Sequence, residues 1–254
     1  MTQQTSKGIT YPESTDHSRI WEHIQTLAGN VDGLLLGTPD VQVFTSSGTW
    51  NKPAGALWVV VEVVAGGGGS GGVGSTSSGQ GSCSGGGGGG ESARGTFSAA
   101  SLGSSVAVTV GAGGTAGGAG PGNGGAGGTS SFGASVTAIG GTGGLACTGT
   151  SGNLFAGSGD GGTGGTGGSF RMQGGAGSTG LVISGLPVKS NLGGASTMSG
   201  QARANPSTSG AQVGNVGYSY GGGASGSSNG SGVAVGTLGA AGAPGIVIVT
   251  TYKA

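Results

Sequence analysis

Glycine recurs with a fixed period in part of this chain. Residues 161–169 read GGTGGTGGS, in which two glycines and one small polar residue repeat every three positions. A period of three matches neither the 3.6 residues of an α-helical turn nor the two-residue alternation of a β-strand, and it equals the three residues per turn of a polyproline-II-type helix. The repeat therefore predicts polyglycine-II helices that pack backbone against backbone and direct their side chains outward.

The abundance of glycine raises the question of disorder. The chain has 70 glycines and 7 prolines in 254 residues, a composition typical of low-complexity segments. Only 6% of the residues are charged, the net charge is zero and the mean hydropathy is +0.09, which disordered chains do not combine. Collagen is excluded because glycine does not occupy every third position over long runs. For the six-glycine run at residues 85–90, a packed tract and a mobile loop are equally favoured.

The low charge also restricts the possible partners. A neutral chain creates no field that would attract nucleic acid or anionic lipid. The first ten residues, MTQQTSKGIT, lack the features of a secretory signal peptide. The most apolar stretch, residues 56–65, contains Glu62 and is shorter than the roughly 20 residues needed to span a bilayer. We expect a protein made in a cytoplasm, with no membrane insertion and no nucleic-acid partner.

Residues 1–36 differ in composition from the rest and are predicted to form a helical segment for attachment or oligomerisation. Ser14, Thr15 and Asp16 are N-cap candidates. Apolar residues follow with coiled-coil spacing at Ile20, Ile24, Leu27, Val31 and Leu34. Because the pattern lasts about two heptads and includes Gly29 and Gly33, the helix requires a partner. That partner is either identical subunits or a larger assembly, and the alternative is packing on the chain's own domain.

Residues 37–254 are predicted to form a glycine-rich β/polyglycine-II sandwich domain, so the expected fold class is mainly β after one short helix. Short runs rich in β-branched residues occur at 41–50, 57–64, 106–110, 136–139, 181–184 and 246–252. The 57–64 run is apolar on both faces, which is typical of a central strand. We expect the C-terminal 246–252 strand to close the sheet beside it. Glycine tracts separate these runs.

Catalytic patterns in the chain lack their required context. Residues 217–221 spell G-x-S-x-G, but no Asp, Glu or His follows Asp160, so a hydrolase triad cannot be completed. Gly120, Gly122 and Gly125 spell G-x-G-x-x-G without a following helical pattern. We therefore expect no enzyme activity, no catalytic residues and no cofactor.

Metal ligands and cysteines are also scarce. His17 and His23 are six residues apart and cannot bind one ion from one helix face. Cys83 and Cys147 are the only cysteines, so one chain cannot build a disulfide framework or a multi-cysteine zinc site. We expect no metal, and cysteines that are free rather than joined in a single disulfide after release from the cell.

Recognition is the remaining function class. Large side chains interrupt the glycine tracts, and residues such as Tyr, Phe and Arg anchor interfaces and stack on sugars. An alternative for the two phenylalanines is that they fill gaps at the edge of the β portion. The candidate receptor-binding residues are Phe155, Phe170, Arg171, Tyr218 and Tyr220.

The order of several segments resembles a known family. VFTSSGTWNKPAG, AGGGGSGG, FSAASLGSSVAVTVGAGG, GGTSSFG and PGIVIVTTY are similar to the glycine-rich domain of tailed-bacteriophage tail fibres and minor tail proteins, over residues 41–254. The N-terminal ITYPESTDHSRIWEHIQTLA resembles the start of minor tail proteins of phages that infect actinobacteria. The resemblance implies a homotrimeric virion component at the tail tip or fibre, assembled in the host cytoplasm.

Three functions follow as hypotheses. The first is a non-enzymatic phage minor tail or tail-fibre adhesin, whose partners are other tail proteins and a host cell-surface glycan or protein. The second is a purely structural tail-tip or spacer protein. The third is an ice-binding or cell-surface glycine-rich protein outside any virus.

Overall fold

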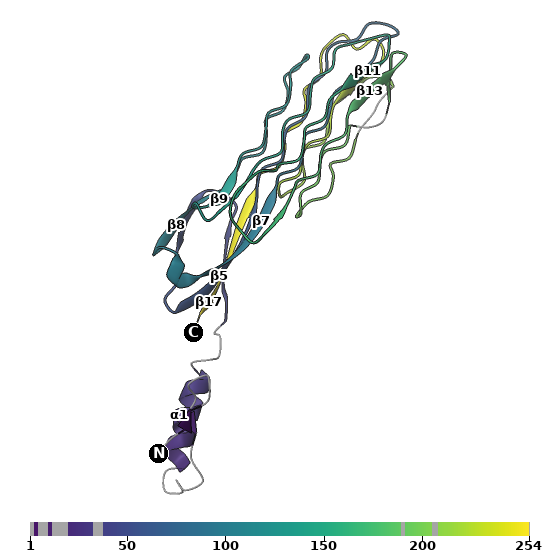
Figure 1. The fold of residues 1–254 in the computed structure, drawn as a ribbon. Coiled ribbons are helices and arrows are strands. Elements are labelled where there is room, and N and C mark those ends of the chain that lie inside the picture. Colours follow the sequence, from purple (N-terminus) through teal and green to yellow (C-terminus); the bar gives the residue numbers. More distant parts are fainter. Residues whose placement is uncertain are drawn as a thin grey trace.

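The computed structural model describes residues 3–4, 10–11, 20–32, 38–188, 191–204 and 208–253. The described residues between 38 and 253 form an elongated body, with the two largest β-sheets at one end and glycine tracts running away from them (Figure 1). The described structure is mainly β, as the sequence predicts. Its helices are α1 (Ile20–Asp32) and a single 3-10 turn at Ala99–Ser101.

The N-terminal segment contains α1 and a two-stranded pair. The strands β1 (Gln3–Gln4) and β2 (Thr10–Tyr11) pair antiparallel. The helix begins at Ile20 and carries the predicted apolar positions through Val31. The proposed N-caps, Leu34 and the proposed domain boundary at residue 36 lie outside the described residues. A coiled coil stays a prediction.

Two antiparallel sheets build the β-sandwich. The first has the order β12-β7-β5-β17-β3, and the second has the order β10-β9-β8-β4. The first sheet consists of β12 (Phe170–Met172), β7 (Ser92–Ser98), β5 (Ala56–Val64), β17 (Ile246–Lys253) and β3 (Asp40–Phe44). The second consists of β10 (Val136–Ala138), β9 (Ser130–Phe132), β8 (Ser105–Thr109) and β4 (Gly48–Asn51).

The position of the C-terminal strand is confirmed. Strand β17 pairs antiparallel with β5, which is therefore central between β17 and β7. Val59, Val61 and Val63 point into the sandwich and are fully buried, as alternation along a strand requires. The opposite face of β5 is less covered than the sequence predicts, because Trp58 is 52% exposed.

The sandwich core joins the inner faces of the two sheets. Trp50 on β4 and Phe132 on β9 are fully buried and meet edge to face, with ring centroids 5.5 Å apart. Residues 45–47 do not form a hairpin loop, because β3 joins the first sheet and β4 joins the second. This short connection therefore carries the chain across the sandwich.

The glycine tract at residues 66–73 forms hydrogen bonds with three neighbouring segments in rotation. Every third amide donates to the same neighbour, so consecutive amides point in three directions. The first neighbour accepts in the pairs Gly66–Gly128, Gly69–Gly125 and Gly72–Gly122, and the second in Gly67–Ala243, Ser70–Ala240 and Val73–Thr237. The third accepts in the pairs Gly68–Gly88 and Gly71–Gly85. A β-ladder would alternate between two sides, so the three-residue period belongs to the backbone as well as to the sequence.

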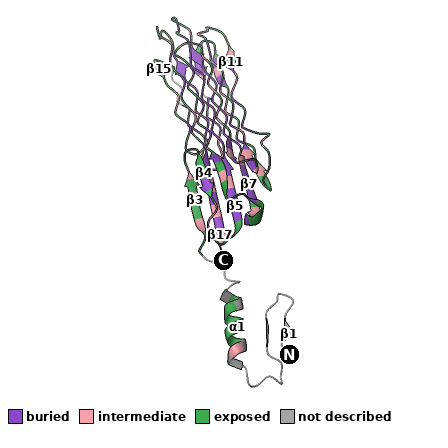
Figure 2. Ribbon diagram, turned by 90° about the vertical axis from the view of Figure 1, so that its left-hand side faces the viewer, coloured by how far each residue is buried: buried purple, intermediate pink, exposed green. Residues whose placement is uncertain are grey.

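The tract at residues 84–91 repeats this pattern and lies inside the body. Every third amide of this tract again donates to the same neighbouring segment. The first segment accepts in the pairs Ser84–Ser227, Gly87–Ala224 and Gly90–Gly221, and the second in Gly85–Leu145, Gly88–Thr142 and Glu91–Ile139. The third segment accepts in the pairs Gly86–Ser178 and Gly89–Gly175. All residues from 81 to 91 are buried, and Figure 2 shows buried residues along the interior of the tracts. The six-glycine run is therefore packed structure and not a loop.

The end of the body farthest from the sandwich carries two small sheets. The first is β11-β13-β14, made of β11 (Leu154–Ala156), β13 (Gly180–Ile183) and β14 (Leu186–Val188). The second is β15-β16-β6, made of β15 (Ala211–Gln212), β16 (Ser228–Asn229) and β6 (Ser82–Cys83). A separate apolar cluster, which includes Val73 and Val182, lies at this end.

Candidate functional site

The predicted attachment stripe on α1 is exposed where the structure describes it. Ile24 is 61% exposed, and Leu27 and Val31 are also exposed. Ile20 is the first residue of the helix, and Leu34 lies outside the described residues. Exposed apolar side chains in one row are compatible with a partner, and the role of the stripe stays a prediction.

The candidate aromatic residues are not brought together. Phe155 lies on β11 at the far end of the body and is 71% exposed, whereas Phe170 lies on β12 at the edge of the sandwich and is 59% exposed. Tyr218 precedes a turn at residues 219–221 that contains Tyr220, and the Gly222 amide donates to the Tyr218 carbonyl over 3.0 Å. The two tyrosines therefore do not sit side by side on an extended strand. Tyr218 is exposed and Tyr220 is half-buried.

Arg171 is already bound within the chain. Its Nη2 lies 2.7 Å from the Oε1 of Glu91, whose side chain is almost fully buried, and its Nε donates to the same oxygen over 3.1 Å. The other carboxylate oxygen accepts the amides of Ile139 and Gly165 at 2.9 and 3.0 Å. Arg171 also donates to the carbonyl oxygens of Thr137 and Gly167. This network of hydrogen bonds connects β12 to the neighbouring segments. Arg171, which the sequence analysis proposed as a receptor-binding residue, therefore also has a structural role.

Sheet register explains why Arg171 and its neighbours face opposite ways. In β12, Phe170 pairs with Arg94 and Met172 pairs with Ser92 of β7. Alternation along the strand places Phe170 and Met172 on the outer face and Arg171 on the inner face. The outer face thus receives an aromatic ring and a thioether side by side.

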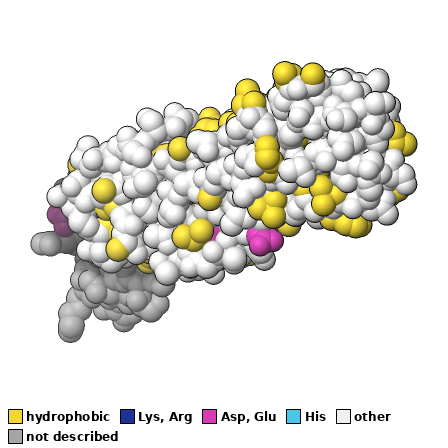
Figure 3. All heavy atoms as spheres, turned by 90° about the horizontal axis from the view of Figure 1, so that it is seen from above, with side chains coloured by type: hydrophobic (Ala, Val, Ile, Leu, Met, Phe, Trp, Pro, Cys, Tyr) yellow, Lys and Arg dark blue, Asp and Glu magenta, His cyan; other side chains and the backbone are white. Residues whose placement is uncertain are grey.

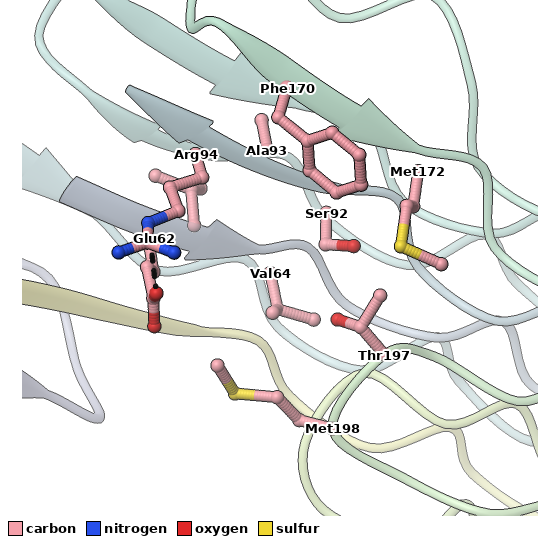
Figure 4. Close-up of a pocket in the computed structure, with 10 residues that line it drawn as sticks. Glu62, Val64, Ser92, Ala93, Arg94, Phe170, Met172, Thr197 and Met198 are labelled. Atoms are coloured by element: carbon pink, nitrogen blue, oxygen red, sulfur yellow. Dashed lines mark ion pairs between the residues drawn. The ribbon is translucent and has the colours of Figure 1, made fainter. Parts of the chain in front are cut away.

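These outer side chains line a pocket of about 260 Å³, which we call the sheet pocket. One row across the sheet is Glu62, Arg94 and Phe170, and the next is Val64, Ser92 and Met172. Thr197 and Met198 approach from a separate loop to complete the wall (Figure 4). The pocket lies where β5 ends and β7 begins, at the junction of the sandwich and the glycine tracts.

The pocket has one charged side and one apolar side. The Nε of Arg94 lies 3.3 Å from Oε1 of Glu62, and both side chains are partly exposed. In Figure 4 this ion pair lies at one side of the pocket, whereas Phe170 and Met172 lie at the other. Within the loop that supplies Met198, the Met198 amide donates a hydrogen bond to Ser196 Oγ over 3.1 Å.

The side chains of the sheet pocket can bind a ligand through apolar contacts and through one ion pair. Glu62 is the only acid that lines it, and neither His nor Cys lines it, so a general acid–base pair is not assembled there. In the parts of the chain that the structure describes, no three His, Cys, Asp or Glu side chains lie close enough to hold a metal ion. Sequence reasoning selected Phe170 but missed Glu62, Arg94 and Met198, because only strand register and a distant loop bring them together.

Figure 3 shows the surface character of one face of the body. Hydrophobic side chains are scattered in small groups over a surface made mostly of backbone and small polar side chains. Few charged side chains appear on this face, in keeping with a composition that is 6% charged. None of the helices that the structure describes could cross a membrane.

The two cysteines are free and buried in the apolar cluster at the far end. Burial raises the pKa of the Cys83 thiol from 9.0 to about 11, with a smaller contribution from Cys147, and burial also raises the pKa of Cys147. Both thiols are therefore protonated at neutral pH and poorly nucleophilic.

The raised pKa of Cys83 predicts a loss of stability at alkaline pH. Below pH 9 the thiol is neutral in both states, whereas above it the unfolded chain ionises first and the folded chain resists ionisation until about pH 11. We expect the free energy of unfolding to fall by about 2 kcal/mol more in the natural protein than in Cys83→Ala between pH 8 and pH 10.5. Urea titrations of both proteins measure this difference, and equal pH dependence would contradict it.

A family model described as a glycine-rich domain matches residues 43–252, which is most of the chain and all of the sandwich except the first residues of β3 and the last residue of β17. No curated protein matches the chain.

Proposed function

We propose that this chain, which belongs to the glycine-rich domain family over residues 43–252, is a non-enzymatic minor tail or tail-fibre protein of a tailed bacteriophage. In this proposal it is a homotrimer that attaches to other tail proteins through residues 1–36. The glycine-rich body then faces outward and binds a host cell-surface glycan or protein. The resemblance of the segment order to phage tail proteins suggests this class, and the arrangement of the body supports the adhesin role within it.

The observation that carries the proposal is the separation of the two ends of the body. Strand β3, which follows the N-terminal segment, pairs with β17, the last strand of the chain. The entry and exit of residues 38–253 therefore lie together, and β11 and β13 lie at the opposite end (Figure 1). Exposed apolar side chains at that far end include Phe155, Ile183 and Leu186. A body anchored at one end and apolar at the other suits a protein that extends from a tail.

We also infer that the glycine tracts are polyglycine-II helices. The rotation of amide donors among three neighbours supports this assignment, because such a helix has three residues per turn. Close backbone approach supports it as well. A Cβ atom placed on Gly87 would lie 2.1 Å from the carbonyl oxygen of Gly68, so a side chain cannot be accommodated between these tracts. Helices packed in this way would make the body a stiff extension of the tail.

Deleting residues 1–36 is expected to separate attachment from recognition. The truncated protein should fold and bind host cells in a sedimentation assay, but it should be absent from tails purified from a phage that encodes it. Its absence follows from loss of the apolar stripe on α1. Full-length protein expressed from the same phage genome is the control for tail incorporation.

Two outcomes of this experiment would contradict parts of the proposal. Incorporation of the truncated protein into tails would show that attachment does not depend on residues 1–36. Failure of both proteins to bind host cells, with normal incorporation of the full-length protein, would favour a purely structural spacer or tip protein.

A further inference from the structure

We infer that the sheet pocket binds one neutral hexopyranose ring of a host surface glycan. This inference rests on the proposed function and names the chemistry of its receptor. Three features support it. They are the size of the pocket, the position of an apolar wall opposite the Glu62–Arg94 ion pair, and the zero net charge of that pair.

The size of the pocket sets the size of the ligand. Its volume of about 260 Å³ lies below the range typical of sites for drug-sized molecules. A single six-membered ring with its substituents is smaller than this volume and fits it. Because Phe170, Met172 and Met198 of the pocket are exposed to solvent, the remainder of a glycan would extend into solvent.

The apolar wall matches one face of a pyranose. Phe170 is 59% exposed and lies beside Met172, and Met198 faces them from its loop. The axial C–H groups on one face of a hexose are weakly positive, and the face of an aromatic ring is negative, so the two surfaces attract each other. Methionine side chains adapt to the outline of the ring.

The ion pair matches the hydroxyl groups of the same ring. The carboxylate of Glu62 accepts hydrogen bonds and the guanidinium of Arg94 donates them, so adjacent hydroxyls can bond to both. Charge-assisted hydrogen bonds of this kind are stronger than neutral ones. Ser92 and Thr197 also line the pocket, and their hydroxyls offer further partners.

The charge of the pocket selects a neutral sugar. Glu62 and Arg94 neutralise each other, and no other charged side chain lines the pocket. An acidic sugar would meet the Glu62 carboxylate without a free cation to balance it. The pair is partly exposed, so it contributes little to stability and can be altered without unfolding the protein.

The methionines provide a direct probe of this site. The chain has three methionines, and Met172 and Met198 both line the pocket. Full-length protein labelled with 13C at the methionine methyls is titrated with glucose, galactose, mannose or N-acetylglucosamine, and with glucuronic acid as the acidic comparison. At least one neutral sugar should shift both pocket methyl signals, saturating at millimolar concentration, while glucuronic acid should not. Met172→Leu and Met198→Leu assign the signals.

Variants test the two walls separately. Phe170→Ala should weaken binding of the neutral sugar at least tenfold. Trp58→Ala, which removes an exposed aromatic residue from the same sheet outside the pocket, should change it less than twofold. Glu62→Gln should weaken neutral-sugar binding and allow glucuronic acid to shift the pocket methyls, because Arg94 then lacks its counter-charge.

The outcomes distinguish this inference from the proposed function. If none of the four neutral sugars shifts both methyls at 50 mM, or if glucuronic acid binds the natural protein more tightly, the saccharide inference is wrong. Host-cell binding by the same protein would then leave the adhesin role intact with another ligand. If a neutral sugar binds as described but the protein does not bind host cells, the site stands and the adhesin function is wrong.

Discussion

Gly87→Ala is expected to destabilise the protein by about 3 kcal/mol. Gly87 lies in the tract at residues 84–91. Its amide donates to the Ala224 carbonyl and its carbonyl accepts from the Gly194 amide, both over 2.8 Å. An added Cβ would lie 2.1 Å from the Gly68 carbonyl oxygen, so the backbones must separate and several hydrogen bonds must lengthen. Urea-induced unfolding, followed by tryptophan fluorescence, measures the change.

Gly118→Ala is the matched control for this prediction. A Cβ at Gly118 meets no atom within 4 Å, and its φ is outside the left-handed region. Alanine there should leave stability unchanged or raise it by up to about 1 kcal/mol, because it restricts the unfolded chain. Equal effects of the two substitutions would contradict the account of glycine as the residue that permits close backbone contact.

Glu91→Ala is expected to cost about 3–5 kcal/mol. The buried carboxylate of Glu91 accepts hydrogen bonds from the side chain of Arg171 and from the amides of Ile139 and Gly165. Removing it leaves a partly buried guanidinium and two amides without their acceptor. Thermal or urea unfolding of the variant measures the loss.

The second Glu–Arg pair of the described body is the control. Glu62 and Arg94 also form an ion pair, at 3.3 Å, but their side chains are 37% and 59% exposed. Glu62→Ala should therefore cost less than about 1 kcal/mol, because water replaces the lost partner. A loss of the same size at both sites would mean that burial does not set the importance of the Glu91 network.

The strands were predictable because their residues carry local signals. The β-branched run at residues 57–64 has apolar side chains on both faces, which is typical of a central strand. In the structure this run lies in β5, which is the central strand of its sheet. The C-terminal run at 246–252 lies beside it in β17. The separation of β3 and β4 into two sheets was not predictable, because a three-residue connection more often makes a hairpin and only the core around Trp50 decides otherwise.

The candidate site was less predictable than the fold. Phe170 and Arg171 are adjacent in sequence and were grouped as recognition residues, yet strand alternation sends one outward and the other onto Glu91. Glu91 is 80 residues from Arg171, so no local pattern indicates their pairing. The sheet pocket likewise depends on register between β5, β7 and β12 and on the distant loop at residues 197–198.

The glycine tracts connect the fold to the proposed function. Two tracts at the centre, 66–73 and 84–91, bond to surrounding segments through nearly every backbone amide. Fixing so much glycine backbone costs more conformational entropy than fixing other residues, and this dense bonding and close packing offset the cost. Among the larger side chains that interrupt the glycine tracts, Phe155 and Phe170 are exposed.

The most direct test of this account is the detection of couplings across backbone hydrogen bonds by NMR in uniformly labelled, deuterated protein. The amides of Gly66, Gly67 and Gly68 should couple to the carbonyl carbons of Gly128, Ala243 and Gly88, which lie in three different segments. The next three amides should repeat the same order of neighbours. Couplings that alternate between two neighbours would indicate a β-ladder. Either that result or the absence of couplings in this tract would contradict the assignment of the glycine tracts as polyglycine-II helices.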